Sequence, residues 1–162
     1  MDWLKQNWLK LYVTFLGAGL SPKAPGTVGS LATLPLVYVL SSLNSPIFYM
    51  GFTVALFVVS IFMCQMYEQQ KGGHDHQEIV IDEVVGILIT MTWLPMTWQS
   101  FLLGFVLFRI LDIWKPLVIG LADRKIKGGL GVMADDVIAG IVANVILQVL
   151  YQKTSILGVQ FQ

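Results

Sequence analysis

Acidic residues in this sequence gather beside apolar segments, where a charged group is costly to place. Seven of the ten acidic residues do so: Asp75, Glu78, Asp82, Glu83, Asp112, Asp135 and Asp136. Acids at helix starts bind free backbone N–H groups, which is one explanation for Asp135 and Asp136. Capping does not explain Asp112, which lies inside the segment Arg109 to Lys115. A divalent cation would relieve the repulsion among such carboxylates, so the pattern favours a metal site.

The residue types indicate which metal such a site would hold. Oxygen ligands with at most two histidines fit Mg²⁺ or Mn²⁺ better than zinc. The single cysteine, Cys64, lies in an apolar run, and one cysteine cannot form a structural zinc site or an internal disulfide. His74 and Asp75 are adjacent in a polar segment, so either could bind a metal or carry a proton. The alternative is that both are simply solvated.

A glycine-rich segment from Leu16 to Ser30 could bind an anion. Its glycines and prolines predict an irregular loop, whose N–H groups would run into a helix beginning at Ser30. The side-chain donors there are Lys23, Thr27 and Ser30. The segment lacks the Gly-Lys-Ser/Thr pattern of a P-loop, and a purely structural turn is the alternative.

Two further cations flank Asp112. Arg109 and Lys115 could hold a phosphate beside a metal ion. Both could equally extend from a helix end to a membrane surface.

The composition indicates a membrane environment. The chain has 162 residues, 56% of them hydrophobic and only 12% charged, and its ten basic and ten acidic residues cancel. Soluble domains are about 25% charged, so little polar surface is available to cover a globule. So apolar a chain is not disordered, and the lack of a basic stripe excludes a nucleic-acid partner.

Apolar periodicity predicts an all-α fold, a compact helical bundle that forms one domain over residues 1–162. Residues 1–15 should form an amphipathic helix at the membrane interface, because one apolar stripe contains tryptophans and has lysines beside it. Ile47 to Met66 would reach about 30 Å as a helix, enough to cross the hydrocarbon core.

The other predicted helices are shorter, so we expect short or re-entrant transmembrane segments. One extends from about Val28 to Leu43 and is interrupted by Pro35, and the last extends from Val137 to Tyr151. The run from Val84 to Phe108 is either one bent helix or two half-length helices divided at Pro95.

Three segments, taken together, resemble the phosphatidylglycerophosphatase A family. They are residues 17–31 (GAGLSPKAPGTVGSL), residues 74–75 with 79–86 (HD and IVIDEVVG), and residues 108–116 with 129–140 (FRILDIWKP and GLGVMADDVIAG). The resemblance covers roughly Phe15 to Leu150 without a missing block. It implies a bacterial inner-membrane phosphatase that requires Mg²⁺ and converts phosphatidylglycerophosphate to phosphatidylglycerol in phospholipid biosynthesis.

The roles expected of the site residues follow from this reading. Metal ligands would be Asp82, Glu83, Asp135 and Asp136, with Asp112 either ligating or orienting. Lys23, Arg109 and Lys115 would hold the phosphate, with Thr27, Ser30 and the loop amides. Catalytic residues would be His74, Asp75, Asp82 and Asp136, because water attacking phosphorus needs a metal and a proton acceptor.

For these motifs to meet, the chain must return to one membrane face between them. Leu31 to Met66 and Val84 to Phe108 should therefore each cross twice or dip and return. Basic residues beside the motifs place that face in the cytoplasm. Substrate and membrane lipids are the expected partners, and a homo-oligomer is possible.

Two other functions would use some of the same features. Intramembrane carboxylates also mark small ion-transport components, and a phosphatase or phosphotransferase for another lipid phosphate could use the same site.

Overall fold

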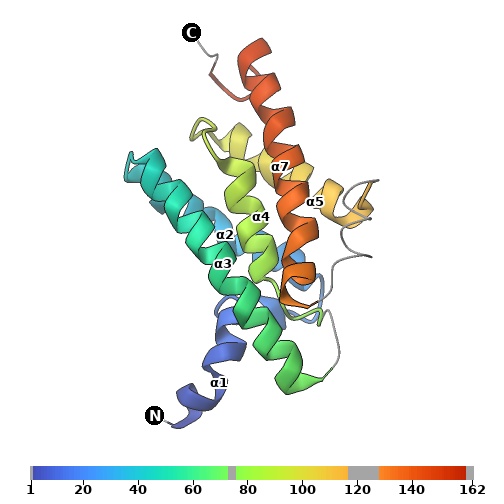
Figure 1. Ribbon diagram of the computed structural model, residues 1–162. Helices are drawn as coiled ribbons and strands as arrows, with labels where there is room; N and C mark the ends of the chain where they lie inside the picture. The colour runs from blue at the N-terminus through green and yellow to red at the C-terminus, as the bar shows by residue number, and fades with distance from the viewer. Residues whose placement is uncertain (1, 73–75, 117–127, 160–162) are drawn as a thin grey trace.

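The computed structural model describes residues 2–72, 76–116 and 128–159, and these residues are all helical or irregular, without a strand. In chain order the helices are α1 (Asp2–Val13), the short 3₁₀ helix η1 (Ala18–Leu20), α2 (Pro25–Ser42), α3 (Pro46–Lys71), α4 (Ile81–Met91), α5 (Trp98–Trp114) and α7 (Gly129–Lys153). The predicted all-α bundle is confirmed. Figure 1 shows an elongated bundle with the two ends of the chain at opposite ends.

The short helix α4 forms the centre of the bundle. It contacts α2, α3, α5 and α7, and Figure 1 shows it between α3 and α7. Val84, Val85, Ile87 and Leu88 of α4 are fully buried. A helix that is apolar around its whole circumference must be enclosed by others, so the central position of α4 follows from its sequence.

The helices alternate in direction, which brings separate parts of the sequence to one end. In Figure 1, α4 and α7 begin at the end where α3 finishes. Gly26 at the start of α2 lies against Glu83 at the start of α4 and Arg109 near the end of α5. The α2–α3 and α4–α5 pairs therefore return to the same end, as the motifs require.

Two predicted helix starts and one predicted helix interruption are wrong. Helix α2 begins at Pro25 rather than near Val28 or Ser30, because proline suits the first turn of a helix. Pro35 lies inside α2 without ending it. The last helix begins at Gly129 rather than Val137. Glycines before Val137 have low helix propensity, so propensity alone does not predict the first two turns.

The run from Val84 to Phe108 forms two helices rather than one bent helix. α4 ends at Met91, and α5 begins at Trp98 after an irregular segment that contains Pro95. Side chains of α7 bind the carbonyl groups left free at this break. The amide of Asn144 donates to the carbonyl oxygens of Thr90 and Thr92, and Gln148 donates to that of Thr92. The break is thereby satisfied inside the bundle.

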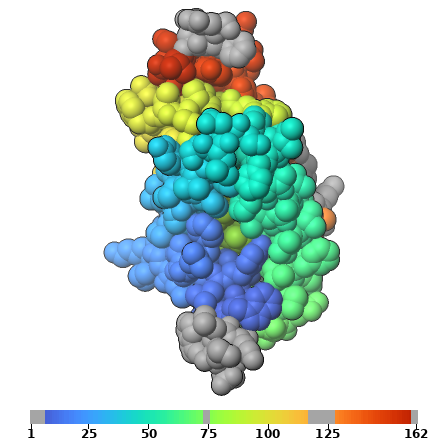
Figure 2. Space-filling view, turned by 90° about the vertical axis from the view of Figure 1, so that its left-hand side faces the viewer, coloured from blue at the N-terminus to red at the C-terminus, as the bar shows by residue number. Residues whose placement is uncertain are grey.

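The outer surface of the bundle is apolar. α3 and α7 have 26 and 25 residues and are each apolar enough to cross a membrane. Only 22% of the most apolar window of α3 is buried, so most of α3 is not a core helix. Exposed apolar side chains on this helix include Val54, Val58 and Phe62, and Figure 2 shows the face that α2 and α3 form. This surface suits lipid, which supports membrane association.

The predicted amphipathic helix at the amino end is present as α1. Its Leu9 and Val13 are buried, and the hydroxyl groups of Tyr12 and Ser60 lie 2.9 Å apart, so α1 packs on α3. Trp8 remains half-exposed. The interfacial position of residues 1–15, and the assignment of residues 1–162 to one domain, stay predictions.

We predict that Gly140→Ala destabilises the protein. A Cβ at Gly140 would lie 2.6 Å from the carbonyl oxygen of Gly86, so α4 and α7 would have to separate. Overpacking of this kind costs about 1–3 kcal/mol, measurable as a lower thermal unfolding midpoint in detergent. Gly51→Ala in α3 is the matched control, because no atom lies within 4 Å of its added Cβ. Equal midpoints for the two variants would contradict the prediction.

Candidate active site

Five carboxylates from three helices meet at one end of the bundle. Asp82 and Glu83 belong to the first turn of α4, Asp112 to the last turn of α5, and Asp135 and Asp136 to α7. Ligand atoms lie within 4.8 Å of one another in two groups: Asp82, Glu83 and Asp136, and Asp112, Asp135 and Asp136. Asp136 belongs to both groups, so the two could bind one ion or two adjacent ions.

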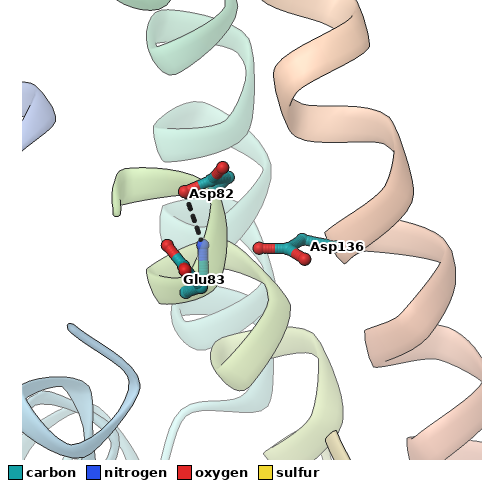
Figure 3. Close-up of side chains that lie close together, drawn as sticks. All are labelled: Asp82, Glu83 and Asp136. Carbon is teal, nitrogen blue, oxygen red and sulfur yellow. Dashed lines mark hydrogen bonds between the residues drawn. The ribbon is translucent and has the colours of Figure 1, made fainter. Parts of the chain in front are cut away.

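The carboxylates of α4 and α7 face one another across the space between these two helices. Figure 3 shows Asp82 and Glu83 on α4 and the side chain of Asp136 extending toward them from α7. The backbone N–H of Glu83 donates to Oδ1 of Asp82, at 3.0 Å. Asp135 and Asp136 lie well inside α7 rather than before it, so they are not helix caps. This removes the structural explanation that the sequence left open for them.

Burial and mutual repulsion make the charged forms of these groups unfavourable. Loss of hydration, followed by the charge of Glu83, raises the pKa of Asp82 well above its usual range. Burial, with the nearby charge of Asp136, raises the pKa of Glu83 to about 8, and Arg109 opposes the rise. A divalent cation would offset both effects, so the donor set fits a hard metal ion.

Two predicted cations lie in the same cluster. The Arg109 guanidinium donates to the Asp112 carboxylate, and its Nη1 lies 3.6 Å from Oε1 of Glu83. Nζ of Lys115 lies 2.7 Å from Oδ2 of Asp135. The side chains of Arg109 and Lys115 therefore lie beside the carboxylates, where one anion could bind to both.

Buried polar atoms in this cluster are available to a ligand. Oε2 of Glu83, Nε of Arg109 and Nε2 of His76 are buried and accept or donate no hydrogen bond within the described part of the chain. Such atoms are costly without a partner. A cation at Glu83 and a phosphate at Arg109 would supply partners of the right charge.

These side chains line one pocket of about 330 Å³. Its remaining walls include Ala24, Pro25 and Gly26 from the start of α2, and His76 and Gln77 from the segment before α4. Gly26 leaves room for two of these side chains, because a Cβ there would lie 2.0 Å from Oε1 of Glu83 and 3.1 Å from Nη1 of Arg109, and the Glu83 carboxylate would have to move. The pocket is the right size for a phosphate group with its metal ligands.

The structure does not bring the predicted side chains of the glycine-rich segment into this pocket. Ser30 is fully buried in α2 and donates to the carbonyl oxygen of Gly26, which satisfies it inside the helix. Thr27 lines a neighbouring apolar groove, and Lys23 is exposed outside the pocket. These three placements correct the predicted anion cradle, because the helix begins earlier than expected. What reaches the pocket is the backbone at the start of α2.

The glycines of this segment act mainly through packing. A Cβ at Gly29 would lie 2.7 Å from Cβ of Val80, and one at Gly19 would lie 2.1 Å from the carbonyl oxygen of Glu78. Both contacts hold the segment against the residues that lead into α4. A structural role, the alternative to anion binding, therefore explains many of the glycines in this segment.

Two predicted catalytic residues, His74 and Asp75, lie outside the described residues, and their roles stay predictions. The pocket instead contains His76, which the sequence analysis did not select. The ring of His76 lies edge-on to Tyr67, with 6.1 Å between centroids. The only sequence signal for His76 was its place between α3 and the Asp82–Glu83 pair.

The fold and the pocket define a class: an all-helical, membrane-associated protein with a carboxylate-rich pocket at one end of the bundle. Comparison with known proteins identifies the family within this class. The model of the phosphatidylglycerophosphatase A family matches residues 11–151, and the chain belongs to this family.

Relatives with the same name are similar over most of their length. The chain is 42% identical to phosphatidylglycerophosphatase A of Escherichia coli over 145 residues, which cover 89% of this chain and 83% of that protein. It is 40% identical to the protein of that name from Haemophilus influenzae, over 87% of each chain. A protein of Bacteroides thetaiotaomicron, provisionally named a phosphatidylinositol-3-phosphatase, is 34% identical over 84% of this chain and 89% of its own length. No solved structure matches the chain.

We predict that Mg²⁺ raises the thermal unfolding midpoint of the protein in detergent, because a bound cation relieves the repulsion among the carboxylates. Asp136→Asn should remove most of this shift, since Asp136 belongs to both ligand groups. Glu78→Gln is the control, because the carboxylate of Glu78 binds Lys71 and Tyr67 outside both groups. A full Mg²⁺ response in Asp136→Asn would count against the site.

Proposed function

We propose that this chain is a lipid phosphatase that hydrolyses the terminal phosphate of phosphatidylglycerophosphate, giving phosphatidylglycerol and inorganic phosphate. The observation that carries the proposal is the meeting of five carboxylates with Arg109 and Lys115 in one pocket. Membership of the phosphatidylglycerophosphatase A family, and the names of the E. coli and H. influenzae relatives, supply the substrate.

The carboxylate cluster supports Mg²⁺ as the cofactor. Its ligands would be Asp82, Glu83 and Asp136, with Asp112 and Asp135 holding the same ion or a second one. Bound there, Mg²⁺ would polarise the phosphate ester and lower the pKa of a water molecule.

The chain itself would bind and orient the phosphate. Arg109 presents a buried Nε without a partner, and Lys115 lies across the pocket beside Asp135. Their charges would offset those of the phosphate oxygens and of the leaving oxygen, which gains charge as the ester bond breaks. The start of α2 adds backbone N–H groups and the positive end of a helix dipole.

The membrane setting is consistent with a lipid substrate. Trp93 is exposed in the segment joining α4 to α5, and Trp98 is exposed at the start of α5. Trp114 is exposed at the other end of α5, next in sequence to Lys115 of the pocket. Tryptophans favour the two interfaces of a bilayer. With Lys71, Arg109 and Lys115 at the pocket end, we propose a bacterial inner membrane with the pocket toward the cytoplasm.

An ion path, the rival that the sequence left open, has less support. No charged residue lies between Ala24 and Tyr67, between Val84 and Phe108, or between Val137 and Gln152. In the described helices the charges are thus confined to the pocket end and the chain ends. Ionisable residues within the membrane segments are what marks an ion path.

The proposal is tested by phosphate release from phosphatidylglycerophosphate in detergent micelles. Purified protein should release phosphate with Mg²⁺, stop with chelator and recover when Mg²⁺ is restored. Asp82→Asn and Asp136→Asn should each lose about a hundredfold or more in activity, because each removes a charged ligand. Cooperative unfolding at a midpoint no lower than that of the Mg²⁺-free wild type would show that both variants are folded. Normal turnover in both would defeat the assignment.

The same assay with phosphatidate and a phosphatidylinositol phosphate tests the substrate. Phosphatidylglycerophosphate should have the highest kcat/KM of the three. A higher value for phosphatidylinositol phosphate would instead align this chain with the Bacteroides relative.

Arg109 and Lys23 should differ sharply in the same assay. Arg109→Gln should lower kcat/KM by about a hundredfold, since a buried charge that binds phosphate is removed. Lys23→Gln should retain most of the activity, because Lys23 is exposed and does not line the pocket. Similar losses in the two variants would show that the glycine-rich segment closes over the substrate and that our placement of Lys23 is incomplete.

A further inference from the structure

An apolar groove lies beside the carboxylate pocket and is not used by the proposed chemistry. Its volume is about 500 Å³, and its walls come from Thr27 of α2 and from one side of α5. The α5 residues are Phe105, Val106, Arg109, Ile110, Ile113 and Trp114.

The groove and the pocket share one wall side chain. Among the described residues, Arg109 lines both cavities. Its guanidinium contacts Asp112 and Glu83 on the pocket side. A phosphate bound at Arg109 would therefore have the remainder of its molecule next to the groove.

The chemistry of the groove suits a hydrocarbon chain. Arg109 is its sole charged wall residue in the described part of the chain, and Val106 and Ile110 are 40% and 50% exposed. From Phe105 to Trp114 the groove follows α5 for about 14 Å at 1.5 Å per residue. This length accommodates much of an acyl chain, and Trp114, 78% exposed, stands at the end where headgroups would lie.

We infer that this groove binds an acyl chain of the phospholipid substrate while its phosphate is held at Arg109. The inference rests on the proposed lipid phosphatase activity and deepens it. The lipid enters from the side of the bundle, between the start of α2 and the last turns of α5. Apolar contact in the groove then contributes to binding a lipid and contributes nothing to binding a free headgroup.

Filling the groove tests this inference. The substrates are dipalmitoyl phosphatidylglycerophosphate in mixed micelles and its deacylated, water-soluble headgroup. Wild-type protein should have at least about tenfold higher kcat/KM for the lipid, the value of burying a few methylene groups. Val106→Trp and Ile110→Trp should lower kcat/KM for the lipid by about tenfold and affect the headgroup much less.

Val54→Trp is the matched control, because Val54 is exposed on α3, whose apolar surface forms another face of the bundle. It should process both substrates as the wild type does. If headgroup turnover is too slow to detect, the lipid kcat/KM of Val106→Trp relative to Val54→Trp decides the question. Unfolding midpoints verify that each variant is folded.

Other outcomes overturn the inference. Equal kcat/KM for lipid and headgroup in the wild type would show that no chain is bound. Equal losses for both substrates in the groove variants would indicate a structural lipid in the groove. Equal effects of Val54→Trp and Val106→Trp would indicate a general effect of the membrane surface. Wild-type protein that hydrolyses neither substrate would instead refute the proposed function itself.

Discussion

Five carboxylates crowded at one end of the bundle repel one another, and the surrounding helices must hold them in place against that repulsion. Each would be better solvated alone, and burial raises the pKa of Asp82 and Glu83. The fold holds them near one another by packing α4 closely against α7 through Gly86 and Gly140. Arg109 and Lys115 offset part of the negative charge. The carboxylates that the chemistry needs therefore destabilise the bundle, and the packing of the helices outweighs their repulsion.

Because the helices alternate in direction, the ionisable groups of the cluster lie together at one end of the bundle. Uncharged stretches of α2, α3, α4, α5 and α7 form the body of the bundle, and the ionisable groups lie where α4 and α7 begin and α5 ends. Such separation lets the body contact lipid while the pocket reaches water. A phosphate monoester on a lipid presents the same division, with a charged group at the surface and chains below it.

Much of this arrangement could be predicted from the sequence. The acids Asp82, Glu83, Asp112, Asp135 and Asp136 were identified from residue type and position, and the structure gathers all five. Helix boundaries were less accessible, because glycine disfavours helices locally while close packing requires it at Gly29 and Gly129. For the same reason Ser30 was expected at a helix start and lies inside α2. His76 was not selected, since nothing local distinguishes a pocket histidine from a solvated one.

Substitution of Gly26 would affect the chemistry of the pocket. The residue carries no functional group, yet its missing side chain leaves the space in which Glu83 and Arg109 approach each other. Alanine or a larger residue at this position would displace the carboxylate of Glu83, so the substitution would lower activity much as loss of an acidic residue in the pocket would. A position that is sensitive to mutation can therefore be one that leaves space for its neighbours as well as one that carries a reactive group. The structure distinguishes these two cases, whereas the loss of activity alone does not.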